Sequence, residues 1–194
     1  MDAAFLRFPW PVDLMTLDDW DALPEIDWPR VELVEGLLTI TAPLPAVHQL
    51  ALMHLCWAFE EQLSGGLVAI HRMAVGLGDD PPTVRIPDVV VAGAEAAKPD
   101  THRFAASDVA LVVEVLSDGT RRIDRILKFA EYAEAGIPQY WIVDIGQEES
   151  QPTTLLAYVL VDGAYELATE VSGRVRLDVA GHEIELDLDA LARR

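Results

Sequence analysis

Cysteine and basic side chains are scarce in this chain. Cys56 is the only cysteine, so an internal disulfide is excluded. The 194 residues include 14 Lys and Arg against 33 Asp and Glu, which gives a formal net charge of −19. Nucleic-acid binding depends largely on Lys and Arg that neutralise phosphates, so this balance argues against broad non-specific binding of duplex. It favours a solvated acidic surface.

Long apolar runs are also missing. The longest unbroken run is Leu155–Val161, which is far too short for a membrane span. Asp2 and the lack of a basic cluster near the first residues give no indication of a secretion signal, so we expect a cytoplasmic protein. The sequence contains no nucleophile elbow, phosphate-binding loop or zinc-type Cys/His cluster.

The composition suits one globular domain over residues 1–194. Hydrophobic residues make up 51% and charged residues 24% of the chain, and the length allows a sizeable core. There is no internal repeat and no linker long enough to divide the chain.

Helical and extended patterns follow one another along the chain. Apolar residues at helical spacing predict two long helices, and Thr16 can cap a short one. The expected helices are 16–23, 47–63 and 121–135. The expected strands are 67–75, 84–92, 109–116 and 139–144, with hairpins at 31–40 (turn near Gly36) and 155–171. Residues 76–83 and 93–107 are expected to be loops, the second one mobile and near the site.

Residues 109–144 read as strand, helix, strand. This βαβ-like unit, together with hairpins and one further long helix, predicts an α/β fold with a mixed central sheet flanked by helices and additional β-hairpins.

Two acidic residues lie in apolar extended segments. Asp88 follows Pro87 and precedes Val89–Val91, and Glu114 lies inside the run 109–116. A buried carboxylate is costly unless a cation or hydrogen bonds satisfy it. Paired carboxylates suit a magnesium ion, which prefers hard oxygen ligands. The alternatives are that Asp88 only caps a turn, and that Glu114 faces water at a strand end or pairs with an arginine.

Lys128 follows the two acids on the predicted helix. A basic group is needed to orient the attacking water or to steady phosphoryl charge during phosphodiester hydrolysis. Asp124 and Tyr132 lie four residues to either side of Lys128, so the three side chains share one helix face. The alternative is an ordinary surface salt bridge between Asp124 and Lys128.

The short motifs around these residues, in this order, resemble those of the Uma2-like restriction-endonuclease family (DUF820) of the PD-(D/E)xK nuclease superfamily. The resemblance is carried by Pro87-Asp88, by Glu114 to Ser117, by the Lys128…Tyr132 spacing and by Tyr140 to Asp144. It implies the restriction-endonuclease-like fold and an ion, Mg²⁺ or Mn²⁺, held by Asp88, Glu114 and the carbonyl of Val115. It also implies a homodimer.

One position departs from the superfamily pattern. The (D/E)xK motif has a lysine two residues after the glutamate, where this chain has Leu116. The resemblance implies that Lys128, on the following helix, takes the place of that lysine.

Further residues are weaker candidates for the site. Glu32 could complete the metal shell or hold Lys128, with Glu35 as a rival, although a hairpin glutamate is usually solvated. His48 could contact phosphate, although a core or capping histidine is the common case. Three arginines after Glu114 could grip backbone phosphate, or simply form a solvated helix face; they are Arg121, Arg122 and Arg125.

The sequence therefore leads to two hypotheses. The first is a Mg²⁺-dependent endonuclease that hydrolyses DNA phosphodiester bonds. The second is a catalytically inactive module of the same fold that binds a protein or nucleic-acid partner, which the absence of lysine at position 116 and the low basic count favour.

Overall fold

The computed structural model describes residues 11–23, 30–41, 43–117, 119, 121–146 and 151–192. The helices of this part of the chain are α1 (Leu17–Asp21), α2 (Ala46–Gln62), α3 (Phe129–Glu134) and α4 (Leu188–Leu191), with a 3₁₀ turn at Ala106–Asp108. A π-helical segment, Ile123–Lys128, leads directly into α3. None of these helices is long and apolar enough to cross a membrane.

A six-stranded sheet forms the centre of the fold, in the order β11-β10-β9-β8-β6-β3. Its strands are β3 (Leu67–His71), β6 (Val89–Gly93), β8 (Val109–Val115), β9 (Gln139–Asp144), β10 (Thr154–Val161) and β11 (Ala164–Ser172). β8 and β9 pair with each other in parallel, and a helical segment connects them along the chain. The other pairs of neighbouring strands are antiparallel. The predicted mixed sheet and its βαβ unit are confirmed.

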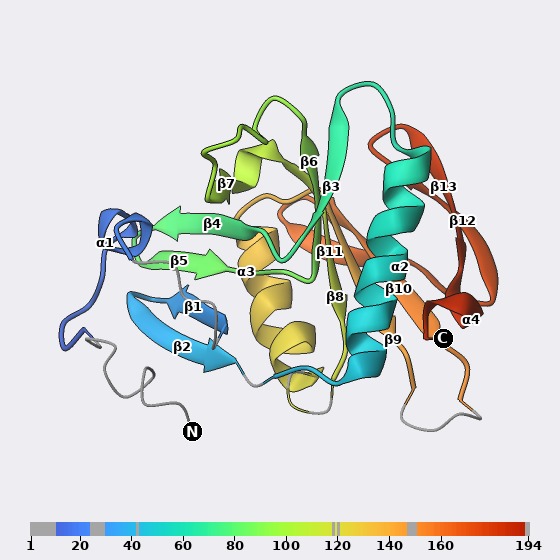
Figure 1. Ribbon diagram of the computed structural model, residues 1–194, viewed down its shortest axis with the longest axis horizontal. Coiled ribbons are helices and arrows are strands. Elements are labelled where there is room, and N and C mark those ends of the chain that lie inside the picture. Colours follow the sequence, from blue (N-terminus) through green and yellow to red (C-terminus); the bar gives the residue numbers. More distant parts are fainter. Residues whose placement is uncertain are drawn as a thin grey trace.

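Helices cover both faces of this sheet, as Figure 1 shows. On one face, Leu55 and Phe59 of α2 pack with Val113 and Val115 of β8. On the other face, Tyr132 of α3 belongs to a second apolar cluster with strand residues such as Val112. β8 is therefore buried on both sides, which explains why its sequence is almost continuously apolar.

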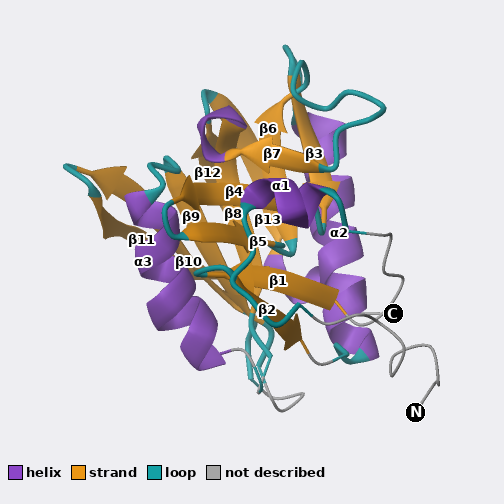
Figure 2. Cartoon of the chain, turned by 90° about the vertical axis from the view of Figure 1, so that its left-hand side faces the viewer, coloured by secondary structure: helices purple, strands orange, loops and turns teal. Residues whose placement is uncertain are grey.

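A five-stranded sheet lies beside the central one, in the order β2-β1-β5-β4-β7 (Figure 2). Its strands are β1 (Arg30–Val34), β2 (Leu37–Thr41), β4 (Ala74–Asp79), β5 (Pro82–Arg85) and β7 (Arg103–Ala105). The β12–β13 hairpin (Arg174–Val179 and His182–Asp187) packs with α2 on the core of the central sheet.

The predicted cap at Thr16 and the predicted turn at Gly36 are confirmed. Thr16 and Asp19 exchange hydrogen bonds in a capping box at the start of α1. Gly36 turns the β1–β2 hairpin at φ +79°, where a side chain would also meet Leu14 and the carbonyl of Met15. These signals depend only on neighbouring residues, so the sequence was sufficient.

Two predicted strands are wrong in extent. The strand expected over 67–75 ends at His71, and Arg72 turns the chain with φ +54° into β4. The strand expected over 84–92 breaks between Arg85 and Val89, and its halves, β5 and β6, join different sheets. The first break falls at His71 and Arg72, and the second contains Pro87 and Asp88. Extended patterns continue on both sides of each break, so periodicity alone did not separate the strands. Asp88 consequently precedes a strand instead of lying within one.

The two predicted loops contain regular structure. Residues 76–83 form part of the β4–β5 hairpin, and 93–107 includes β7, which pairs in parallel with β4. Such pairing depends on partners distant in the chain. The helix expected over 121–135 is present, but its first half is π-helical, a feature that often occurs at functional sites.

Candidate active site

Asp88 and Glu114 lie side by side at one end of the paired strands β6 and β8. The register pairs Val89 with Val113, and its continuation by one residue sets Asp88 against Glu114. The backbone N–H of Val115 donates to Asp88 Oδ2 at 2.9 Å. Both carboxylates are buried, with 2% of Asp88 and 1% of Glu114 exposed. The structure thus brings together the two acids that the sequence singled out.

Glu114 receives two hydrogen bonds from the helix that follows β8. Lys128 Nζ donates to Glu114 Oε1 at 2.7 Å, and the Tyr132 hydroxyl donates to the same oxygen at 2.8 Å. Burial, followed by the nearby charge of Glu114, raises the pKa of Tyr132 well above its usual value, so this hydroxyl keeps its proton. Glu114 is buried, so the alternative that it faces water at a strand end is wrong.

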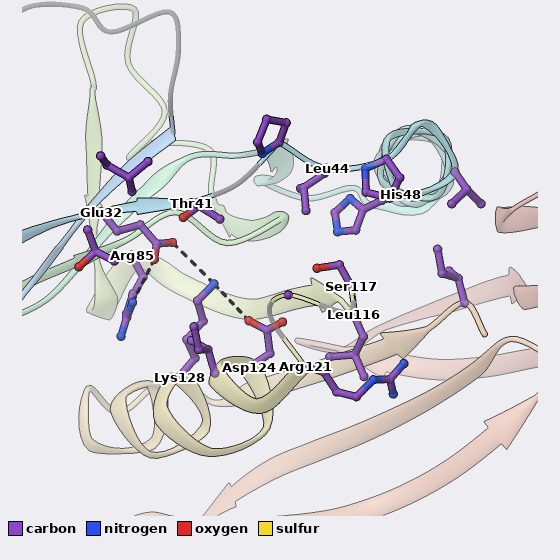
Figure 3. Close-up of a pocket in the computed structure, with 18 of the residues that line it drawn as sticks. Glu32, Thr41, Leu44, His48, Arg85, Leu116, Ser117, Arg121, Asp124 and Lys128 are labelled. Carbon is purple, nitrogen blue, oxygen red and sulfur yellow. Dashed lines mark hydrogen bonds and ion pairs between the residues drawn. The ribbon is translucent and has the colours of Figure 1, made fainter. Parts of the chain in front are cut away.

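Lys128 is surrounded by acids. Besides Glu114, its Nζ lies 3.4 Å from Asp124 Oδ1 and 3.6 Å from Glu32 Oε1 (Figure 3). Lys128 and Asp124 are both buried, so the alternative of a surface salt bridge between them is wrong. The π-helical segment carries both residues and turns them toward the interior.

Glu32 belongs to a second buried ion-pair network beside Lys128. Arg85 donates from Nη1 to Glu32 at 3.0 Å and from Nε and Nη2 to Glu131, at 2.7 Å each. The N–H of Ile86 also donates to Glu32 at 3.0 Å. Burial alone would lower the pKa of Arg85, but the hydrogen bonds to Glu131 and the charge of Glu32 outweigh it and raise this pKa. Glu32 is buried, unlike Glu35, which is exposed in the turn.

His48 enters the site from α2. Its Nε2 lies 2.8 Å from the carbonyl oxygen of Val115 and 3.1 Å from Asp88 Oδ2. Since a carbonyl oxygen only accepts, Nε2 carries the proton. His48 is almost fully buried, and its Nδ1 has no hydrogen-bond partner among the described residues. His48 therefore does more than fill the apolar stripe of α2.

A cavity of about 550 Å³ opens onto this cluster. Five of the buried site residues form its polar floor: Glu32, His48, Arg85, Asp124 and Lys128. Asp88 and Glu114 are not among the residues that line the cavity. They lie directly behind His48 and Lys128, which contact them.

The three arginines expected to contact phosphate do not all face the cavity. Arg121 lines it but forms an ion pair with Asp144, and Arg125 Nη2 lies 3.5 Å from the same carboxylate. The hydrogen bond from Arg121 lowers the pKa of Asp144. Arg122 is exposed on the helix.

The chemistry of the site fits a hard divalent cation. Asp88 Oδ2 and the Val115 carbonyl oxygen both lie within 3.1 Å of a single atom, His48 Nε2, so these two hard donors converge on one point. Glu114 supplies a second carboxylate from the neighbouring position. Among the described residues, no three His, Cys, Asp or Glu side chains are grouped to hold a metal. Two carboxylates and waters suffice for magnesium, which would have to displace His48 Nε2 from the Val115 carbonyl and Asp88.

Arg85 and Glu131 were missed at the sequence level. Arg85 stands three residues before Asp88, between Val84 and Ile86, and a guanidinium buried in such a segment requires acidic partners. That signal was available, but the identity of the partners was not, because Glu32 and Glu131 are 53 and 46 residues away along the chain.

The chain is similar to one protein family and to a solved structure. The profile of the Uma2 family, described as "Putative restriction endonuclease", matches residues 17–190. The structure is similar to the crystal structure of a putative nuclease belonging to DUF820 from Anabaena variabilis, with a TM-score of 0.66 and 16% identity over 92% of this chain and 97% of that chain. No curated protein matches the sequence. The predicted restriction-endonuclease-like α/β fold is confirmed.

Proposed function

The chain belongs to the Uma2 family, which is described as "Putative restriction endonuclease", and we propose that it is a metal-dependent endonuclease that hydrolyses DNA phosphodiester bonds. The observation that carries the proposal is the convergence of Asp88, Glu114 and Lys128. Lys128 Nζ lies 2.7 Å from Glu114, and Asp88 is hydrogen-bonded to the residue that follows Glu114.

Asp88, Glu114 and the Val115 carbonyl would hold the ion, Mg²⁺ or Mn²⁺. When bound, such an ion lowers the pKa of a water molecule and stabilises charge on the phosphoryl oxygens. The donor set supports this proposal because it consists of hard oxygens directly behind His48 and Lys128, which line the cavity.

Lys128 is the group that meets the substrate in this proposal. Its ammonium lines the cavity and can donate to a non-bridging phosphate oxygen or orient the attacking water. Asp124 and Glu32 flank this ammonium and limit its motion. Arg85 fixes Glu32 in turn, so it acts as a positioning residue without touching the substrate.

His48 holds the Asp88 and Val115 oxygens in register before an ion arrives. Once released from them, its imidazole lies at the cavity floor and can donate to phosphate. We further propose a homodimer, which the family resemblance implies.

Plasmid nicking tests this function directly. Purified protein with Mg²⁺ or Mn²⁺ is expected to convert supercoiled plasmid to open circles, and EDTA is expected to stop the reaction. Glu114→Gln removes the charge of one ligand and is expected to abolish nicking, while Glu166→Gln, on exposed β11, serves as the matched control. Wild-type nicking in the Glu114 variant, or nicking that survives EDTA, would rule the proposal out.

A non-catalytic binding module is the second candidate. The observation in its favour is that His48 Nε2 already donates to the Val115 carbonyl and lies 3.1 Å from Asp88 Oδ2. Calorimetric titration with Mn²⁺ separates the two candidates. No heat of binding, together with unchanged thermal stability in Asp88→Ala, would favour the module.

A further inference from the structure

The cavity has the size of a pocket for a small molecule. Its volume of about 550 Å³ falls within the range of roughly 300–1,000 Å³ that is usual for ligand pockets. The carboxylates of Asp88 and Glu114 lie behind its floor and are almost fully buried. A phosphate therefore has to enter the cavity before it can approach them.

Apolar side chains form most of the cavity walls above the polar floor. They come from β2, the segment leading into α2 and the first turn of α2 on one side. On the other side they come from the ends of β8 and β9 and the start of the π-helical segment. These residues are Ile40, Leu44, Val47, Leu116, Ile123 and Ile145. Figure 3 shows Leu44 and Leu116 on different sides of the cavity. Apolar walls of this kind suit an unstacked base, which offers a flat apolar face.

The charges around the cavity do not suit a duplex. Each cation that lines it has an acidic neighbour: Lys128 contacts Glu114, Arg85 contacts Glu32, and Arg121 contacts Asp144. Recognition of a duplex backbone relies on Lys and Arg that neutralise successive phosphates. The cavity instead presents partly exposed apolar side chains, those of Ile40 and Ile123.

We propose that the cavity accepts one nucleotide unit of an unpaired strand, with the base against the apolar walls and the phosphate at Lys128. The substrate class is thus single-stranded or locally unpaired DNA in preference to intact duplex. This inference rests on the proposed nuclease function.

Binding measured without cleavage tests the inference first. Fluorescence anisotropy would compare one labelled DNA oligonucleotide as a single strand and annealed to its complement, with the Glu114→Gln protein in Mg²⁺. The single strand is expected to bind at least about tenfold more tightly, since stacking and apolar contact require an unpaired base. Equal affinities, or tighter binding of the duplex, would overturn the inference.

Two further variants in the same background locate the binding site. Ile123→Ala is expected to weaken binding of the single strand roughly threefold to tenfold, because it removes part of the wall. Leu167→Ala, which trims an exposed apolar side chain on β11, is expected to leave binding unchanged. An equal loss in both variants would contradict the proposed place of the base.

Cleavage of the same oligonucleotides by wild-type protein in Mn²⁺ distinguishes the two proposals. Faster cleavage of the single strand, or of a duplex with an unpaired central loop, supports both. Equal cleavage of the fully paired duplex overturns the substrate inference and leaves the nuclease function standing. Failure to cut any of these DNAs overturns the nuclease function, and the anisotropy result then shows whether the cavity still selects an unpaired strand.

Discussion

Lys128 and Glu114 form a buried ion pair, with Nζ 2.7 Å from Oε1 and no more than about 2% of either residue exposed. The pair joins the end of a central strand to the helix that follows it. Asp124 and Glu32 lie on the other sides of the ammonium. Lys128 is therefore the point where the metal-binding candidates and the Arg85 network meet.

Replacement of Lys128 by methionine is expected to affect both stability and activity. Loss of one partner of a buried ion pair leaves uncompensated carboxylates and costs about 3–5 kcal/mol. Nicking should fall by roughly 100-fold or more if the ammonium assists the reaction. Chemical denaturation and plasmid assays measure the two effects, and Lys98→Met, at an exposed position, is the control. Full activity in a folded Lys128→Met protein would exclude the assigned role.

Arg85→Met is expected to destabilise the fold by about 3–5 kcal/mol, because Glu32 and Glu131 then lose their shared guanidinium. The matched change is Arg176→Met, which removes an exposed pair with Glu185 and should cost no more than about 1 kcal/mol. Urea denaturation of both variants gives the comparison. Similar losses in the two proteins would show that the buried network contributes little.

The acid stability of the protein should depend on Arg121. Its hydrogen bond lowers the pKa of Asp144 from the usual 3.8 in the folded state. A lowered folded-state pKa stabilises the fold at pH above 3.8, and the contribution disappears as the pH falls through the lowered value. Arg121→Gln should cost no more than about 1 kcal/mol at neutral pH, because the pair is partly exposed. Its stability should match that of wild type in strong acid, as followed by circular dichroism.

Cys56 should react slowly with thiol reagents. Burial, assisted by the negative charges of Glu60 and Asp88, raises its pKa from 9.0 to about 11. At pH 8 the thiolate fraction is therefore about 100-fold smaller than for a thiol with a pKa of 9.0, and only the thiolate is nucleophilic. Alkylation by iodoacetamide, followed by mass spectrometry, should be correspondingly slower in the folded protein than in urea. Equal rates would show that the thiol is not shielded.

The candidate site could be predicted from the sequence only in part. Asp88 and Glu114 were recognisable because charged residues in apolar strands demand an explanation. Lys128 was recognisable from the family resemblance and its helix spacing. Glu32 was a candidate for holding Lys128, and the two side chains are 3.6 Å apart. The link from Glu32 through Arg85 to Glu131 was not recognisable, because these residues come from three separate elements. His48 was a weak candidate, and nothing in its local pattern indicated contacts with Val115 and Asp88.

By itself the sequence determined the features that depend on neighbouring residues. These are the cap at Thr16, the turn at Gly36, the long helices and the apolar strand β8, since propensity and periodicity act over a few residues. Tertiary structure alone decided the division of 84–92 between two sheets, the burial of the Asp124–Lys128 pair and the cavity in front of it. Those features depend on which distant segments pack together, and a local pattern of residues does not determine the free energy of that packing.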